Sequence, residues 1–127
     1  MVVLGGGSAG VAAVVKAAQL GARVALVNAE RLGGTCVNVG CVPSKFLIRA
    51  AALKRAAERP HLRRLSAKVE VDGETLTAHM REVVERLRRE KYEDVLACYD
   101  VEVVEGYGKL RTRGRWRWAG ECWRAGG

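Results

Sequence analysis

A glycine-rich stretch near the amino terminus constrains the fold of this chain most. Val2-Val3-Leu4 is short and apolar, as buried strands are, and it runs directly into Gly5-Gly6-Gly7-Ser8-Ala9-Gly10, which has the spacing Gly-x-Gly-x-x-Gly. An apolar helical pattern follows to about Leu20, and residues 23–28 form a second β-rich run. Strand, glycine turn, helix and strand in this order predict a βαβ unit with a parallel sheet, and therefore an α/β fold.

Each glycine of this motif has a physical role in binding a dinucleotide. Gly5 allows a tight turn, Gly7 lets the backbone approach a pyrophosphate, and Gly10 lets the helix pack closely on the strand. The helix amino terminus, with Ser8 and Ala9 in its first turn, offers unpaired N–H groups and a positive dipole end to phosphates. The alternative is a glycine-rich loop without a ligand, which the strand–helix context makes the weaker interpretation.

Asn28 departs from the usual form of this motif. It lies at the end of the second β-rich run, where an acidic residue normally binds the ribose hydroxyls of the adenosine. Asparagine both donates and accepts hydrogen bonds, but it lacks the charge-assisted strength of a carboxylate. We therefore expect ribose recognition by Asn28 to be weakened.

A second motif contains two cysteines five residues apart, Cys36 and Cys41. On a regular helix their Cα atoms would be roughly 8.7 Å apart, whereas a disulfide requires less than about 7 Å. If the two pair, the turn between them must be distorted, and Gly40 supplies the backbone freedom. Pro43 suits a first helical turn, and Lys45 follows one turn after Cys41. A helix amino terminus and a cation both favour a thiolate at Cys41, so we predict a redox centre.

The two cysteines have two other interpretations, as buried hydrophobic residues or as zinc ligands. A pair of cysteines in an intracellular chain can simply be buried as small hydrophobic residues. A zinc site is disfavoured, because the pair lacks the Cys-x2-Cys spacing and both histidines, His61 and His79, lie far away in the sequence.

Residues 33–45, Gly-Gly-Thr-Cys-Val-Asn-Val-Gly-Cys-Val-Pro-Ser-Lys, closely resemble the active-site segment of the flavin-dependent pyridine nucleotide-disulfide oxidoreductases. That family includes glutathione reductase, dihydrolipoamide dehydrogenase and mercuric reductase, and residues 46–51 are most similar to mercuric reductase. The resemblance implies that Cys36 exchanges thiols with the substrate and that Cys41 makes a charge-transfer contact with the flavin. It also implies that Lys45 lies near the reactive nitrogen of the flavin.

The resemblance further implies an incomplete Rossmann-like FAD-binding domain with a long helical insertion. Residues 87–110 also resemble mercuric reductases, in which the strand-Gly-x-Gly stretch lies by the adenine. The residues assigned to the cofactor are Gly5, Gly7, Ser8, Ala9, Gly10, Asn28, Gly33, Gly34, Thr35, Lys45, Gly106, Tyr107 and Gly108.

The function implied by the resemblance is electron transfer from NADPH to FAD, then to the Cys36–Cys41 disulfide, and finally to Hg(II) or a disulfide substrate. Hg(II) would be held transiently by Cys36 and Cys41 as substrate and not as a structural metal. The NADPH site is expected outside this chain, which has no second Gly-x-Gly-x-x-Gly. We therefore expect the chain alone to be inactive. The later Gly-Asp segment that holds the ribityl chain of the flavin in the family is also missing from this chain, so we expect weak or no retention of FAD. Full-length members of the family are homodimers.

Alternatives to a mercuric reductase fragment stay open. As an alternative, the chain can derive from an enzyme similar to dihydrolipoamide dehydrogenase or glutathione reductase. It can also be a non-enzymatic remnant that binds a thiophilic metal or a nucleotide without turnover.

Further elements are expected in the second half of the chain. An apolar pattern predicts a helix from Pro43 to about Ala57. Apolar residues at intervals of three and four predict one long helix from Glu74 to about Ala97, with Glu85/Arg88 among the ion pairs on its exposed face. Residues 101–110 alternate and predict a strand followed by a turn.

The last 17 residues differ in composition from residues 1–110. They contain five Arg and all three Trp of the chain, and they contribute +4 to the net charge of +8. Basic residues interleaved with tryptophan mimic a surface for single-stranded nucleic acid. However, 14 of the 17 residues are Arg, Trp, Gly or Ala without an apolar period. We therefore interpret 111–127 as a non-native, frameshifted or disordered basic tail after a domain at 1–110, and expect no nucleic acid partner.

The expected location is the cytoplasm. Four scattered cysteines are too few for a secreted disulfide scaffold. The uncharged first fifteen residues lack a basic leader region, and Lys16 interrupts them before the length of a membrane span is reached. We expect no membrane association.

Overall fold

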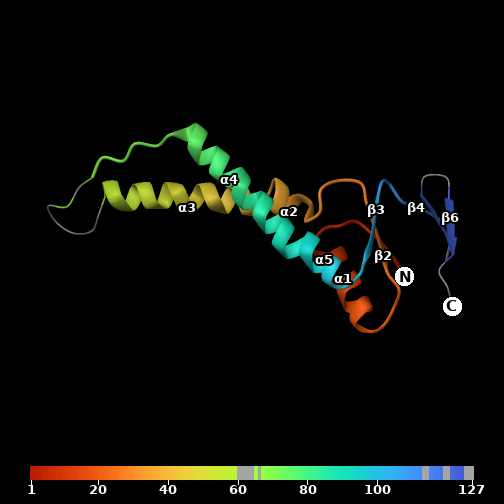
Figure 1. Ribbon diagram of the computed structural model, residues 1–127. Helices are drawn as coiled ribbons and strands as arrows, with labels where there is room; N and C mark the ends of the chain where they lie inside the picture. The colour runs from red at the N-terminus through yellow and green to blue at the C-terminus, as the bar shows by residue number, and fades with distance from the viewer. Residues whose placement is uncertain (60–64, 66, 113–114, 119–120, 125–127) are drawn as a thin grey trace.

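The computed structural model describes residues 1–59, 65, 67–112, 115–118 and 121–124 (Figure 1). Strands β1 (Val2–Leu4), β2 (Ala25–Asn28) and β3 (Glu102–Glu105) form a parallel sheet in the order β1-β2-β3. Helix α1 (Ser8–Gln19) connects the first two strands. This arrangement confirms the predicted α/β class and the βαβ unit, with the second strand beginning two residues later than expected.

The connection from β2 to β3 is helical and contains α2 (Gly34–Asn38), α3 (Cys41–Glu58), α4 (Gly73–Arg88), η1 (Arg89–Glu93) and α5 (Asp94–Cys98). The predicted long insertion between the redox helix and the third strand corresponds to α4, η1 and α5. Figure 1 shows α3 and α4 side by side, extending away from the sheet. The predicted helix at 74–97 is therefore present, but a π-helical turn, η1, interrupts its regular pattern.

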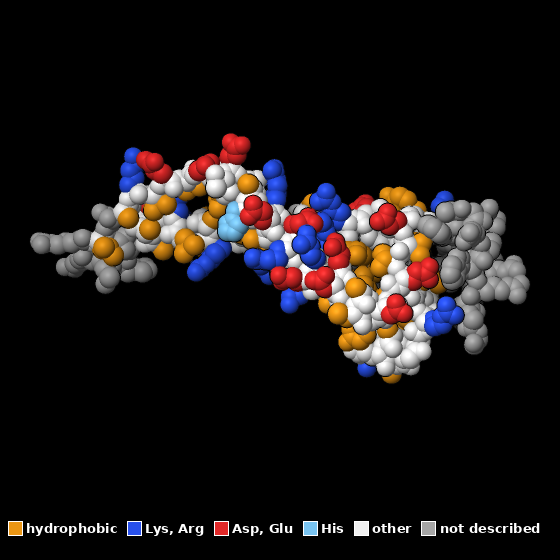
Figure 2. Space-filling model, in the orientation of Figure 1, with side chains coloured by type: hydrophobic (Ala, Val, Ile, Leu, Met, Phe, Trp, Pro, Cys, Tyr) orange, Lys and Arg blue, Asp and Glu red, His pale blue; other side chains and the backbone are white. Residues whose placement is uncertain are grey.

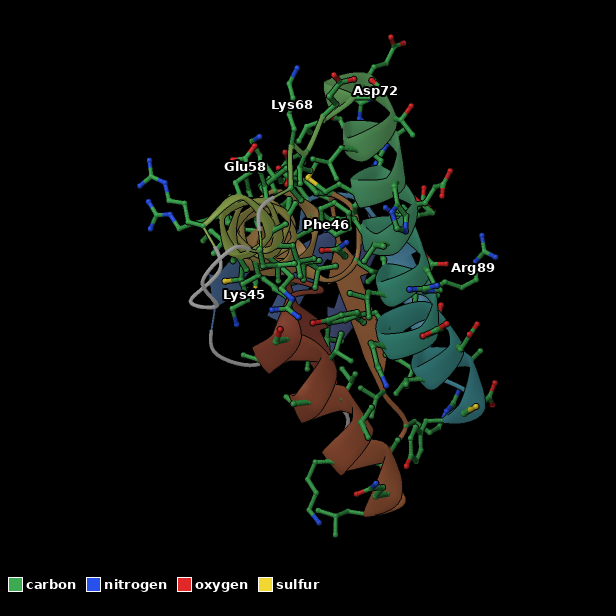
Figure 3. The ribbon with its side chains drawn as sticks, turned by 90° about the vertical axis from the view of Figure 1, so that its left-hand side faces the viewer. Lys45, Phe46, Glu58, Lys68, Asp72 and Arg89 are labelled. Atoms are coloured by element: carbon green, nitrogen blue, oxygen red, sulfur yellow. The ribbon has the colours of Figure 1, made fainter. Side chains whose placement is uncertain are left out.

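Two contacts join α3 to the chain that follows it. The ring of Phe46 meets His79 of α4 edge to face, with 5.3 Å between the ring centroids, and Figure 3 shows Phe46 between the two helices. Near the far end of α3, Lys54 donates a hydrogen bond to the carbonyl oxygen of Val69 at 2.8 Å and forms an ion pair with Glu58. The first contact thus joins α3 to α4, and the second joins α3 to the segment that precedes α4.

Asp72, the residue before α4, caps the start of this helix. The Asp72 carboxylate accepts hydrogen bonds from the backbone N–H groups of Glu74 and Thr75 at 3.0 and 3.3 Å. It also accepts one from the Thr75 hydroxyl at 2.5 Å, and these donors hold the pKa of Asp72 below its usual value. The side chain therefore satisfies N–H groups that a helix start leaves without an intrahelical partner.

The core lies between the sheet and the helices α1 and α5. Its buried residues are Val11 and Val14 of α1, Leu26 of β2, Leu96 of α5, and Val101. Of the apolar stripe predicted along the long helix, Val84 and Leu96 are buried. By contrast, α3 buries none of its residues, and Figure 2 shows apolar side chains on the surface of the projecting helix pair.

The last described segments form a separate antiparallel sheet. Strands β4 (Lys109–Thr112), β5 (Arg115–Trp118) and β6 (Glu121–Arg124) pair in this order, with Trp116 opposite Trp123 in the backbone register. Where it is described, the backbone of 111–127 is therefore strand. The interpretation of these residues as a non-native or disordered tail is not tested by this pairing and stays a prediction.

One stretch of the described residues meets a length and composition criterion for a membrane span. It covers residues 34–58, which comprise α2 and α3. Core helices of soluble proteins and signal sequences meet the same criterion. The expectation of no membrane association therefore stays a prediction.

The core generates a stability prediction. Leu96 is 1% exposed, whereas Leu53 on α3 is 54% exposed. Leu96→Ala should lower the free energy of unfolding by about 2–5 kcal/mol because it leaves a cavity between α5 and the sheet. Leu53→Ala should change it by less than about 0.5 kcal/mol. Urea unfolding followed by circular dichroism measures both, and equal losses would contradict this core.

Candidate dinucleotide and dithiol site

The first glycine motif forms a tight backbone turn after β1. Gly5 has φ of +96°, in the region that favours glycine, and its N–H donates to the carbonyl oxygen of Val27 at 2.8 Å. A Cβ atom at Gly10 would lie only 1.9 Å from the carbonyl oxygen of Gly5. A Cβ at Gly7 would meet no atom within 4 Å. Gly10 is thus required for helix–strand packing, while Gly7 borders open space.

The amino terminus of α1 is open to an anion. Gly7 is the residue before the helix, no side chain caps the helix start, and the first turn contains no acidic residue. Ser8 and Ala9, the first two helical residues, are exposed. The N–H groups of the first turn and the positive end of the helix dipole can therefore bind phosphate, as the motif predicts.

Asn28 holds the glycine turn in place. Its Oδ1 accepts a hydrogen bond from the Gly6 N–H at 2.8 Å, and its Nδ2 donates to the carbonyl oxygen of Glu30. Sequence reasoning missed this structural role, although a polar residue at the end of a buried strand was the signal for it. The predicted contact of Asn28 with a ribose is not tested and stays a prediction.

The Gly106-Tyr107-Gly108 stretch reaches the same edge of the sheet. The N–H of Gly106 donates to the carbonyl oxygen of Asn28 at 3.0 Å. A Cβ at Gly108 would lie 2.4 Å from Leu4 Cδ2, so this glycine packs directly over the end of β1. Tyr107 is 77% exposed. The carboxyl ends of all three parallel strands therefore bring the predicted cofactor residues together, as is typical for ligand sites in parallel sheets.

The second glycine pair docks on the first motif. Gly33 donates its N–H to the carbonyl oxygen of Gly6 at 2.8 Å. A Cβ at Gly34 would lie 3.2 Å from the Cα of Gly7, and both Gly33 and Gly34 have positive φ. This backbone contact places the segment with the two cysteines beside the dinucleotide motif, although more than 20 residues separate the two in sequence.

The two cysteines lie on either side of a helix break. Cys36 is on α2, which ends at Asn38, and Cys41 is the first residue of α3. A Cβ at Gly40 would lie 2.9 Å from the carbonyl oxygen of Thr35, so glycine allows the chain to turn tightly between the two helices. The predicted distortion is thus confirmed. Both cysteines are exposed and in the thiol form.

The thiol groups interact with each other and with Lys45. The hydrogen bond with the Cys41 thiol raises the pKa of the Cys36 thiol above its ordinary value, and the charge of Cys41 acts in the same direction. The Lys45 ammonium, one turn further along α3, lowers the pKa of Cys36. The three predicted catalytic residues are therefore within electrostatic reach of one another.

Asn38 and Arg88 support the dithiol segment, and sequence reasoning did not identify their role. Asn38 Nδ2 donates to the carbonyl oxygens of Leu32 and Gly34, at 2.9 Å each. Arg88 Nη1 donates to Asn38 Oδ1 at 3.4 Å, and the Arg88 side chain is 11% exposed. The sequence signal for this role was Asn38 itself, a polar residue in an otherwise apolar segment between the two cysteines.

Arg88 is itself held by two acidic residues. It forms the predicted ion pair with Glu85, but the expectation that this pair lies on an exposed face was wrong, because Arg88 turns inward toward Asn38. Its Nε donates to Glu93 at 3.1 Å across the π-helical turn. Within the described ranges, no group of three or more His, Cys, Asp and Glu residues could hold a metal ion. The candidate ligands for a thiophilic ion in this site are therefore the two thiols.

Comparisons with known proteins agree with this geometry. The model of the pyridine nucleotide-disulphide oxidoreductase family matches residues 1–117. The chain belongs to this family. Its match extends beyond residue 110, the limit of the resemblance seen in the sequence.

Named relatives include two kinds of enzyme. The chain is 34% identical to a mercuric reductase of Lysinibacillus sphaericus and 37% identical to a dihydrolipoyl dehydrogenase of Bacillus subtilis, over 111 residues in each case. Each alignment covers 87% of this chain but only 20% and 23% of the relative. The chain thus spans about a fifth of the length of these relatives.

A solved structure gives the same fold. The HOCl-induced flavoprotein disulfide reductase RclA from Escherichia coli superposes with a TM-score of 0.76 at 28% sequence identity. The match covers 97% of this chain and 25% of that protein. The fold of the chain is therefore that of the corresponding part of a flavoprotein disulfide reductase.

Gly10 and Gly7 should respond differently to the same substitution. Gly10→Ala should lower the free energy of unfolding by about 1–3 kcal/mol or more, because the added Cβ would overlap the Gly5 carbonyl oxygen. Gly7→Ala should leave it nearly unchanged, because its Cβ would enter open space. Urea unfolding of the two variants measures this contrast, and equal stabilities would contradict the tight turn.

The thiol pair predicts a pH effect. The alkylation rate of Cys36 in the reduced chain should reach half of its plateau at a pH above the ordinary thiol value of about 8.5. Cys41→Ala should shift this midpoint to lower pH, because it removes the thiol hydrogen bond and the negative charge while Lys45 stays in place. Iodoacetamide labelling with peptide mass spectrometry measures the midpoint. A midpoint that stays or rises in Cys41→Ala would contradict the coupling.

Proposed function

We propose that this chain is the N-terminal, FAD-binding part of an NAD(P)H-dependent disulfide or mercuric reductase, with Cys36 and Cys41 as its redox pair. The observation that carries the proposal is the contact of Gly34 with Gly7. It brings the segment with the two cysteines next to the glycine motif, which supports a single site for a dinucleotide and a dithiol. Membership of the pyridine nucleotide-disulphide oxidoreductase family supports the same conclusion.

The residues present suit a flavin dinucleotide. The open space at Gly7 and the uncapped start of α1 suit the pyrophosphate, with Ser8 and Ala9 in the first turn. The residues proposed for the adenosine end are Asn28, Gly106, Tyr107 and Gly108, and those for the flavin end are Gly33, Gly34, Thr35 and Lys45. When bound, FAD supplies two-electron chemistry between a nicotinamide and a disulfide.

The cysteines perform the thiol chemistry. Two electrons and two protons convert the Cys36–Cys41 disulfide to two thiols. The Cys36 thiolate then attacks one sulfur of a substrate disulfide, and the other substrate sulfur leaves and takes a proton. The Cys41 thiolate attacks Cys36 Sγ in turn, which restores the Cys36–Cys41 disulfide and releases the second substrate thiol. The exposure of both cysteines is consistent with access for a substrate.

Hg(II) is the other substrate class that the dithiol could accept. A pair of thiolates is the ligand type that a soft metal ion prefers. Similarity of residues 46–51 to mercuric reductases favours this substrate, whereas 37% identity to a dihydrolipoyl dehydrogenase favours a small disulfide. We propose Hg(II) as the first candidate and a dihydrolipoamide-like or glutathione-like disulfide as the second.

Two measurements test this proposal. Mild oxidation with diamide should link Cys36 to Cys41 reversibly and leave the exposed Cys98 unlinked, as peptide mapping would show. FAD and ADP should bind with saturation in equilibrium dialysis. Gly7→Val should weaken both affinities about tenfold or more, equivalent to the loss of one hydrogen bond to a charged group.

The controls test the redox pair and the dinucleotide site independently. Cys36→Ser should abolish the diamide-induced link and leave ADP binding unchanged. A folded chain that binds neither FAD nor ADP would overturn the dinucleotide site. A link that forms between Cys98 and either motif cysteine in preference to Cys36–Cys41 would overturn the redox pair.

A further inference from the structure

Two hydroxyl groups meet at the start of α1. Ser8 Oγ, on the first residue of the helix, lies 2.9 Å from the hydroxyl oxygen of Tyr92, which is 84 residues away in the sequence. Tyr92 belongs to η1, the π-helical turn inside the long helix. Such turns occur frequently at functional sites because the extra residue changes the direction of the side chains that follow.

The Tyr92 side chain is anchored by packing. Its ring lies against the core cluster that includes Val11, Val14 and Leu96. The hydroxyl at its tip is therefore held at the amino terminus of α1, next to Gly7. This is the place where an added Cβ would find open space and where the first-turn N–H groups have no side-chain cap.

The hydrogen bond between the two hydroxyls leaves one hydroxyl hydrogen available to another acceptor. Each hydroxyl carries one hydrogen, and a single hydrogen bond between them uses one of the two. If the more acidic phenol donates to Ser8 Oγ, the hydrogen of Ser8 is free to donate to an anion. The first turn of α1 contains no acidic side chain that would compete for this donor.

We propose that Tyr92 is a positioning residue of the dinucleotide site, which orients the Ser8 hydroxyl so that it donates a hydrogen bond to a phosphate oxygen. This inference rests on the proposed dinucleotide-binding function. It assigns to the helical insertion a direct part in phosphate recognition, in addition to its packing on the sheet.

The chain offers a matched control for a merely structural role. At the opposite end of α1, Gln19 Nε2 donates to the hydroxyl oxygen of Tyr99, also at 2.9 Å. Both tyrosines thus tie α1 to the end of the long helix through one hydrogen bond. Only the Tyr92 pair lies at the glycine motif. If both hydrogen bonds merely hold α1 in place, removing either tyrosine hydroxyl should change ADP affinity equally. If Tyr92 acts in phosphate binding, removing its hydroxyl should weaken ADP binding more than removing that of Tyr99.

The experiment compares Tyr92→Phe, Ser8→Ala, Tyr99→Phe and the Ser8→Ala/Tyr92→Phe double variant. The probes are ADP, which carries the phosphates, and adenosine, which lacks them. Both single variants at the hydroxyl pair should weaken ADP binding about tenfold or more, as expected for one hydrogen bond to a charged group. The double variant should be little weaker than either, because both act through one donor. Tyr99→Phe should bind ADP as the wild type does, and adenosine affinity should be the same in all variants.

The outcomes are distinguishable. ADP binding by Tyr92→Phe equal to that of the wild type would overturn the inference and leave the proposed function standing. An equal loss in Tyr92→Phe and Tyr99→Phe, or an equal loss for adenosine and ADP, would also overturn it in favour of a structural tie. A wild-type chain that binds neither FAD nor ADP would overturn the proposed function together with the inference. Circular dichroism melting confirms that each variant is folded.

Discussion

The site depends on close contact between two glycine turns. Gly6 accepts a hydrogen bond from Gly33, and Gly7 and Gly34 approach so closely that a Cβ at Gly34 would lie 3.2 Å from the Cα of Gly7. Without side chains between them, the two backbones can meet directly. The start of α1 and the dithiol segment are thereby brought next to each other in the candidate site.

The strand ends determine where this contact forms. Parallel strands present their carboxyl ends at one edge, so the turns after β1 and β2 and the Gly106 turn after β3 converge there. Asn28 connects them, because its side chain accepts from Gly6 while its backbone carbonyl accepts from Gly106. A single residue at the end of β2 thus fixes the relative position of turns from two other parts of the chain.

The long helical insertion supports the site from the other side. Arg88 reaches Asn38 between the two cysteines, and Tyr92 reaches Ser8 at the start of α1. Glu85 of α4 and Glu93 of the π-helical turn both form ion pairs with Arg88. Because these contacts join residues 50 and 84 positions apart, the insertion links the dithiol half and the phosphate half of the site.

The local sequence determined the elements, because strand, glycine turn and helix signals lie within a few residues of one another. The Gly5–Gly10 motif, the Cys36–Cys41 pair with Gly40, and Lys45 were all predictable in this way, and so was the parallel βαβ unit. Only the tertiary structure decided that Asn28 closes the glycine turn, that Arg88 supports Asn38, and that Tyr92 meets Ser8. These contacts depend on the register of the sheet and on a π-helical turn that shifts the phase of the long helix. A periodic pattern of apolar residues carries no information about either, because it reports which face of an element is buried and not which distant residue it meets.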